Sequence, residues 1–91
     1  MQFVYTIHAE NKLRLWEIVE LAIDKKKIEK TVKTPTVVDK SELPVIIAIG
    51  KLNKELSLCV AYKKTTGKKV KIITFYPAER GRYESKILQR R

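Results

Sequence analysis

The chain has 91 residues, of which 44% are hydrophobic, and its formal net charge is +10. This length fits one domain with a small apolar core, and the hydrophobic content is too high for a disordered chain. No apolar run approaches the roughly 20 residues of a membrane span, and the N-terminus lacks signal-peptide features, so we expect a cytoplasmic protein that does not enter membranes. The abundance of Lys, Glu and Ile over Asn and Gln is typical of thermophiles.

The first part of the chain predicts a strand followed by a helix. Residues 3–7 are β-branched and aromatic, as in strands. From His8 onward the apolar residues recur with helical spacing, so we expect one amphipathic helix of about four turns over residues 8–23. Tyr5 and Trp16 are expected in the core rather than as a surface for stacking bases. The residues expected on the buried side of the helix are Leu15, Ile18, Val19 and Ala22, flanked by Trp16 and Ile23.

A second helix is expected from an N-cap at Asp24 as far as Thr34, just before Pro35. Ile23 and Ile28 occupy the two positions of a hydrophobic staple around that cap. The lysines at positions 25–27 then lie at the positive end of the helix dipole, which is unfavourable. Either a bound anion or neighbouring glutamates must compensate, and we expect the glutamates to do so.

After Pro35 the apolar pattern changes to a period of two. It predicts an extended piece at 36–38, a polar turn at 39–42, and strands at 45–49, 56–62 and 69–76. Residues 65–68 form a hairpin turn, Pro77 ends the last strand, and residues 79–89 can be helical. We therefore expect a single α+β domain over residues 1–91, with two N-terminal helices packed on a three- to four-stranded antiparallel sheet and a short C-terminal helix.

The positive charge is concentrated near the C-terminus. Residues 63–91 hold ten basic and two acidic side chains, net +8, whereas residues 1–62 are net +2. Such segregation on a small domain favours a polyanionic partner, RNA or DNA, over a lysine-rich surface that is merely solvated.

Three segments, in this order, resemble a small domain of unknown function that is widespread in archaea and bacteria, over about residues 7–84. They read HAENKL, IEKTVKTPTVV and LSLCVAYKKTTGKKVKIITFYPAERGRYE. The same plan resembles the RelE and BrnT toxins, small RNA endonucleases that act on the ribosome or on free RNA and pair with an antitoxin. The resemblance implies a RelE/BrnT-like fold, with RNA, free or ribosome-bound, and an antitoxin protein as partners.

One position departs from the toxin pattern. BrnT-like toxins end the last strand with an arginine in a stretch similar to RIISARKA, where this chain reads KIITFYPA and has Tyr76 instead. This departure weakens the case for cleavage. Arg80, Arg82 and Tyr83 match the basic and tyrosine element downstream, and His8 matches the histidine that opens the first helix. The candidate catalytic residues are therefore His8, Arg80, Arg82 and Tyr83, which match the toxins, together with Tyr76, which stands where the toxins have an arginine.

Cleavage of RNA through the 2′-hydroxyl needs a proton acceptor, cations beside the phosphorane and a proton donor, and it can proceed without a metal. Arginine can hold a phosphate through its planar fork, and tyrosine can stack on a base or donate a proton. The alternative is that Tyr83 packs beneath the terminal helix and His8 caps a helix. The basic side chains expected to bind nucleic acid are Lys63, Lys64, Lys69, Lys71, Arg80 and Arg82.

Other chemistries have little support in the sequence. The single His8 and the single Cys59 lie far apart, and the three glycines are isolated, so we expect no metal site, no phosphate-binding loop and no cofactor. Cys59 lies in an apolar strand and is expected to be an inert core residue. Two functions remain open: an RNA-binding protein that acts as a toxin-like endonuclease, and a non-catalytic module that binds another protein.

Overall fold

The computed structural model describes residues 1–80, so most of the expected C-terminal helix, with Arg82 and Tyr83, lies outside the described residues. In this part of the chain, three helices and five strands follow one another. They are β1 (Gln2–Tyr5), α1 (Ile7–Lys12), α2 (Trp16–Glu20), α3 (Lys25–Lys33), β2 (Val37–Glu42), β3 (Val45–Lys51), β4 (Leu56–Lys64) and β5 (Lys69–Glu79). None of these helices has the length and apolar character needed to span a membrane.

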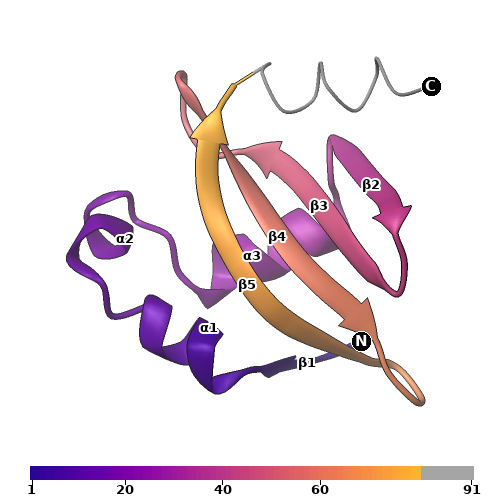
Figure 1. The fold of residues 1–91 in the computed structure, drawn as a ribbon. Helices are drawn as coiled ribbons and strands as arrows, with labels where there is room; N and C mark the ends of the chain where they lie inside the picture. Colours follow the sequence, from indigo (N-terminus) through magenta and orange to yellow (C-terminus); the bar gives the residue numbers. More distant parts are fainter. Residues whose placement is uncertain (81–91) are drawn as a thin grey trace.

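The strands form one mixed sheet in the order β1-β5-β4-β3-β2 (Figure 1). The strands β2 to β5 form the expected antiparallel meander, and β1 adds to its edge in parallel with β5, from Gln2 opposite Lys69 to Tyr5 opposite Ile72. The α+β class is therefore confirmed, while the expected three- to four-stranded antiparallel sheet is in fact a five-stranded mixed one.

Residues 8–23 do not form one helix, as the spacing predicted, but the two short helices α1 and α2. Ala9 and Ile18 are both buried in the core. They are nine residues apart, so at about 100° per residue they would lie on opposite sides of one straight helix. The break over residues 13–15, with Leu15 in an extended conformation, lets both side chains face the sheet.

The end of α2 is a Schellman motif built on an alanine. The N–H of Ile23 donates to the carbonyl of Ile18, and the N–H of Ala22 donates to that of Val19. Ala22 occupies the left-handed position, with φ 57°. Ile18 and Ile23 are both buried, which gives the motif its usual apolar contact.

Helix α3 confirms the expected cap. The Asp24 side chain accepts a hydrogen bond from the N–H of Lys27 at 2.9 Å, and the helix ends with Thr34 as its C-cap. The lysines that follow the cap were expected to be compensated by glutamates, and Lys25 does form an ion pair with Glu10, with 2.6 Å between Nζ and Oε1.

Two predicted strand ends are wrong. Residues 39–42 continue β2 through a bulge instead of forming a polar turn, because the buried Asp39 accepts a hydrogen bond from the N–H of Ser41 and the turn comes at residues 43–44. Pro77 does not end β5, which runs on to Glu79. Since β1 covers β5 only as far as Ile72, the second half of β5 is an edge, where a strand tolerates proline.

The two sides of the sheet have separate apolar clusters. On the helix side, Val60, Ile72 and Phe75 are fully or almost fully buried with Ile28 of α3. Neighbouring residues of a strand point to opposite faces, and Cys59 accordingly belongs with Ile49 to a second cluster on the other side. We call that other side the open face, because none of the three helices covers it (Figure 1). Cys59 is buried, as expected of a core residue.

Candidate nucleic-acid interface

The structure brings four of the predicted nucleic-acid-binding lysines together on the hairpin of β4 and β5. Lys63 lies directly opposite Lys71, Lys64 opposite Val70, and Lys69 beside Gln2 of β1. Gly67 shapes the turn with a φ of 74°, a conformation that glycine adopts without strain. The hairpin therefore holds positive charge on both of its faces.

Lys63 and Lys71 place two like charges directly opposite each other on this hairpin. Both belong to the open-face set of their strands, because each neighbours a residue of the helix-side core, Tyr62 and Ile72. Neither has a carboxylate partner within residues 1–80, where the ion pair found is that of Lys25 with Glu10. Like charges directly opposite each other destabilise a sheet, so this pair favours an anion that neutralises it.

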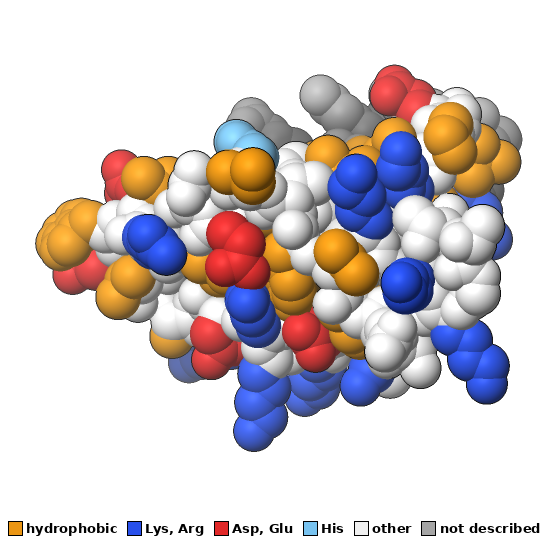
Figure 2. Space-filling model, turned by 90° about the horizontal axis from the view of Figure 1, so that it is seen from below, with side chains coloured by type: hydrophobic (Ala, Val, Ile, Leu, Met, Phe, Trp, Pro, Cys, Tyr) orange, Lys and Arg blue, Asp and Glu red, His pale blue; other side chains and the backbone are white. Residues whose placement is uncertain are grey.

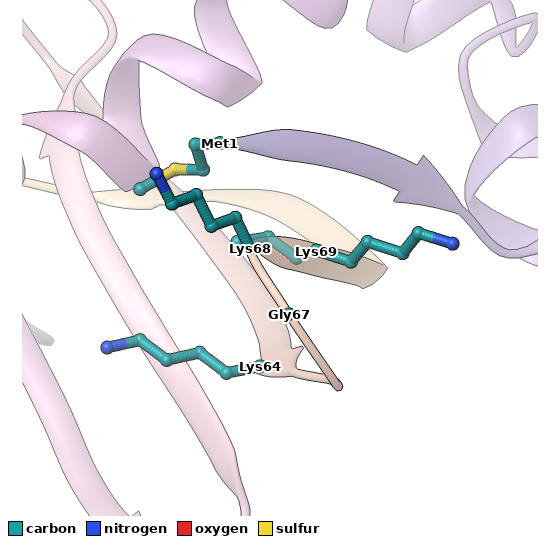
Figure 3. A pocket seen from close by; sticks show the side chains of 6 residues that line it. Met1, Lys64, Gly67, Lys68 and Lys69 are labelled. Carbon is teal, nitrogen blue, oxygen red and sulfur yellow. The ribbon is translucent and has the colours of Figure 1, made fainter.

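The tip of the hairpin encloses a hollow of about 320 Å³, lined by Met1, Lys64, Gly67, Lys68, Lys69 and Val70. The side chains of Lys64, Lys68 and Lys69 leave the backbone in different directions, and Lys68 runs beside Met1 (Figure 3). Because the three ammonium groups diverge, the hollow is a poor fit for one small anion. Spread-out cations of this kind suit an extended polyanion better.

His8 lies beside the open face, in contact with β5. Its Nε2 is 3.1 Å from the Oγ1 of Thr74, and the ring is exposed. Thr74 and Tyr76 are two residues apart on one face of the strand, which places them roughly 7 Å from each other. Through its contact with Thr74, His8 thus lies on the same stretch of β5 as Tyr76, another candidate catalytic residue.

Lys12 is a site residue that the sequence analysis missed. Its Nζ lies 5.5 Å from the ring centre of Phe75 and 5.8 Å from that of Tyr76, so it lies against β5 beyond the part that pairs with β1. Lys12 can reach these two rings because α1 ends at Lys12 and because β1 pairs with β5 only as far as Ile72. Periodicity gave one long helix there, so the sequence held no signal for this contact.

Arg80 lies at the opposite end of β5 from the lysines. Its N–H donates to the carbonyl of Glu55, and its guanidinium reaches the carbonyl of Lys54 at 3.4 Å. Nine residues separate it from Lys71, which corresponds to about 30 Å of strand. The predicted basic residues within residues 1–80 therefore lie near the two ends of β5, the lysines at one end and Arg80 at the other, with His8 and Tyr76 between them.

A second basic groove lies on the helix side, between α3 and the end of β3. It has a volume of about 340 Å³ and is lined by Lys27, Lys30, Thr31, Thr34, Thr36, Gly50, Lys51 and Leu58. The hydroxyls of Thr31 and Thr34 donate their protons to the carbonyls of Lys27 and Lys30. These hydroxyls therefore have no proton left to donate to an anion.

Tyr5 has a structural role rather than a binding one. Its hydroxyl donates to Glu29 Oε2 at 2.7 Å, and the ammonium group of Lys25 lies 4.7 Å from its ring centre. Burial raises the pKa of the Tyr5 hydroxyl far above its usual value, and the Glu29 carboxylate raises it further. Tyr5 packs against the core, as expected, and this network ties β1 to α3.

Trp16 was expected in the core, and this prediction is wrong: its side chain is 70% exposed. The break between α1 and α2 turns it outward.

Within residues 1–80 no three His, Cys, Asp or Glu side chains lie close enough together to hold a metal ion. Comparison of the chain with protein families, curated proteins and solved structures gives no match.

Proposed function

We propose that this protein binds RNA along β5, with the opposed Lys63 and Lys71 as the main phosphate contact. The observation that carries the proposal is that these two cations face each other across adjacent strands without a carboxylate partner in residues 1–80. A bound phosphate would relieve their repulsion and supply the missing counter-charge.

A single strand fits this surface better than a duplex. Basic residues lie at both ends of β5, about 30 Å apart, and Tyr76 between them offers a ring on which a base can stack. The resemblance of the sequence to the RelE and BrnT toxins points to the same substrate. A RelE/BrnT-like fold, an antitoxin partner and a cytoplasmic location belong to this proposal.

Cleavage of the bound strand is the second candidate, favoured by the contact between His8 and Thr74. If Nε2 donates its proton to Thr74 Oγ1, Nδ1 carries the free lone pair and can accept a proton from a 2′-hydroxyl. Lys12 and Lys71 would then supply cations near the phosphorane. Tyr76, on the same face of β5 as Thr74, would donate a proton to the leaving oxygen.

Two assays test both candidates. In the first, the purified protein is incubated with total RNA, with and without ribosomes, and cleavage is measured. In the second, its binding to single-stranded RNA, duplex RNA and single-stranded DNA of one length is measured. We expect the single strand to bind better than the duplex and the binding to weaken with salt. His8→Ala should keep binding, and should abolish cleavage if His8 accepts the proton. Absence of salt-sensitive binding to any of these nucleic acids would refute the proposed function.

A further inference from the structure

The groove between α3 and the end of β3 has a neutral floor and a cationic rim. Its floor consists of buried residues, and three exposed lysines stand at its rim. The helix packs against β3 and β4 on this side of the sheet (Figure 1). Its volume of about 340 Å³ is at the lower end of the roughly 300–1,000 Å³ typical of small-molecule sites, so it has room for a compact ligand. The floor residues are Thr31, Gly50 and Leu58, and the rim lysines are Lys27, Lys30 and Lys51.

Gly50 keeps the floor of this groove open. A Cβ at this position would lie 3.3 Å from Cγ2 of Thr31, which is closer than ordinary van der Waals contact. Any larger side chain on Gly50 would occupy the space between the strand and the helix. Glycine inside a strand weakens it and often marks a place where a ligand or another backbone approaches closely. The missing side chain therefore leaves the space next to Thr31 for a ligand.

The rim lysines differ from other lysines of α3 in having no partner. Lys25 pairs with Glu10, and Lys33 lies over an aromatic ring. In the part of the chain that the structure describes, the rim lysines have neither a carboxylate nor an aromatic ring beside them. Lys27 and Lys30 are three residues apart, so they are neighbours on the helix surface and repel each other. Figure 2 shows Lys and Arg side chains projecting into solvent from the lower edge of the molecule, beyond the nearby acidic side chains.

The acidic side chains nearest in sequence are engaged elsewhere. Glu29, the acidic residue of α3, accepts the hydroxyl proton of Tyr5, and Asp24 caps the helix. None of the residues that line the groove is acidic. The exposed Thr36 adds a donor, because its hydroxyl makes no hydrogen bond within residues 1–80, while its backbone N–H donates to the carbonyl of Ile49. An anion in the groove would thus meet donors and cations alone.

We propose that this groove binds the diphosphate group of a small molecule, or inorganic pyrophosphate itself. The three lysines match the charge of a diphosphate, and ammonium groups bind phosphate oxygens through strong charge-assisted hydrogen bonds. No aromatic side chain lines the groove, so a base has nothing to stack on and recognition rests on the phosphates. The groove lies on the helix side of the sheet, whereas Lys63 and Lys71 belong to the open face, so this site does not rest on the proposed function.

Titration calorimetry with pyrophosphate at fixed ionic strength tests this inference. We expect one pyrophosphate to bind per chain, and orthophosphate to bind more weakly because it reaches fewer of the lysines. ADP should bind no more tightly than pyrophosphate. Lys30→Gln and Lys51→Gln should each weaken the binding of pyrophosphate about fivefold, the effect of one exposed ion pair. Lys26→Gln is the matched control, because it removes the same charge from α3 but does not line the groove.

NMR spectra recorded during the titration locate the bound anion. Amide shifts should change most around Thr31, Thr36 and Gly50, and the double variant Lys63→Gln with Lys71→Gln should bind pyrophosphate as the parent does. No saturable binding, tighter binding of ADP, or equal weakening by Lys26→Gln would overturn the inference. Shifts centred on the hairpin, or lost binding in the hairpin variant, would also overturn it, by assigning the anion to the RNA surface. Loss of RNA binding alone in that variant leaves it intact, so the two proposals fail separately.

Discussion

Ala22 ends α2 in a backbone conformation that is unfavourable for alanine. The Schellman motif needs a left-handed residue after α2, and at φ 57° an alanine is strained where glycine would not be. We expect Ala22→Gly to raise the free energy of unfolding by about 0.5–1 kcal/mol, after the larger entropy of glycine in the unfolded chain is included. Urea unfolding measures this, and a lower midpoint for Ala22→Gly would contradict the assigned geometry.

The raised pKa of Tyr5 predicts that the free energy of unfolding falls at alkaline pH. Its pKa is raised in the folded state, so the folded chain keeps the hydroxyl proton that the unfolded chain releases above about pH 10. The stability that this hydroxyl contributes is therefore complete below that pH and is lost as the pH rises further. The pKa of Tyr62 is raised as well, by burial.

Tyr5→Phe isolates this contribution. Removing the hydrogen bond to Glu29 should lower the free energy of unfolding by about 1 kcal/mol at neutral pH. The difference between the parent and Tyr5→Phe should shrink as pH rises above about 10, because the parent alone carries this hydroxyl, while Tyr62 is common to both. Urea midpoints at a series of pH values measure the difference, and a constant gap would argue against the raised pKa.

Residues whose role is local could be predicted from the sequence, and residues whose role depends on distant partners could not. Asp24 caps its own helix and Gly67 shapes its own turn, so neighbouring residues were enough to identify both. Trp16 was placed wrongly because the break between α1 and α2 decides its exposure, and Lys12 was missed because its contacts depend on how α1 packs against β5. The pairing of Lys63 with Lys71 needed the register of two strands, although the hairpin itself was predicted.

At the scale of elements, the break between α1 and α2 outweighs the local preference for one helix. No glycine or proline lies in residues 8–23, so nothing in the segment itself signals a break. The helix breaks because Ala9 and Ile18 must both be buried against the sheet, which one straight helix does not allow. Parallel pairing of β1 with β5 has a similar origin, because the two strands are separated by nearly the whole domain.

The hairpin itself should be more stable without its opposed charges. We expect Lys71→Gln to raise the free energy of unfolding by up to about 1 kcal/mol at low salt, because it removes the repulsion by Lys63. The gain should fall at high salt as the charges are screened. Lys69→Gln is the control, since Lys69 lies beside the uncharged Gln2. Equal effects of the two substitutions would show that the Lys63–Lys71 contact carries no repulsion.

At the scale of the whole molecule, charge separates two surfaces of different character. The hairpin end carries lysines without carboxylate partners within residues 1–80, and the α2 end carries an apolar patch with acidic neighbours. The uneven charge was visible in the sequence, but its division between opposite ends of one domain required the fold.

The measurement that tests the central claim most directly is the salt dependence of binding to a short single-stranded RNA. Replacing both Lys63 and Lys71 with glutamine should weaken binding and flatten the slope of log affinity against log salt by about 1.4, the value for two lost phosphate contacts. The control pair Lys26→Gln and Lys40→Gln removes the same charge from α3 and β2 and should leave the slope unchanged. If the hairpin variant keeps the parent's affinity and slope, Lys63 and Lys71 do not bind the RNA backbone, and the proposed interface is wrong.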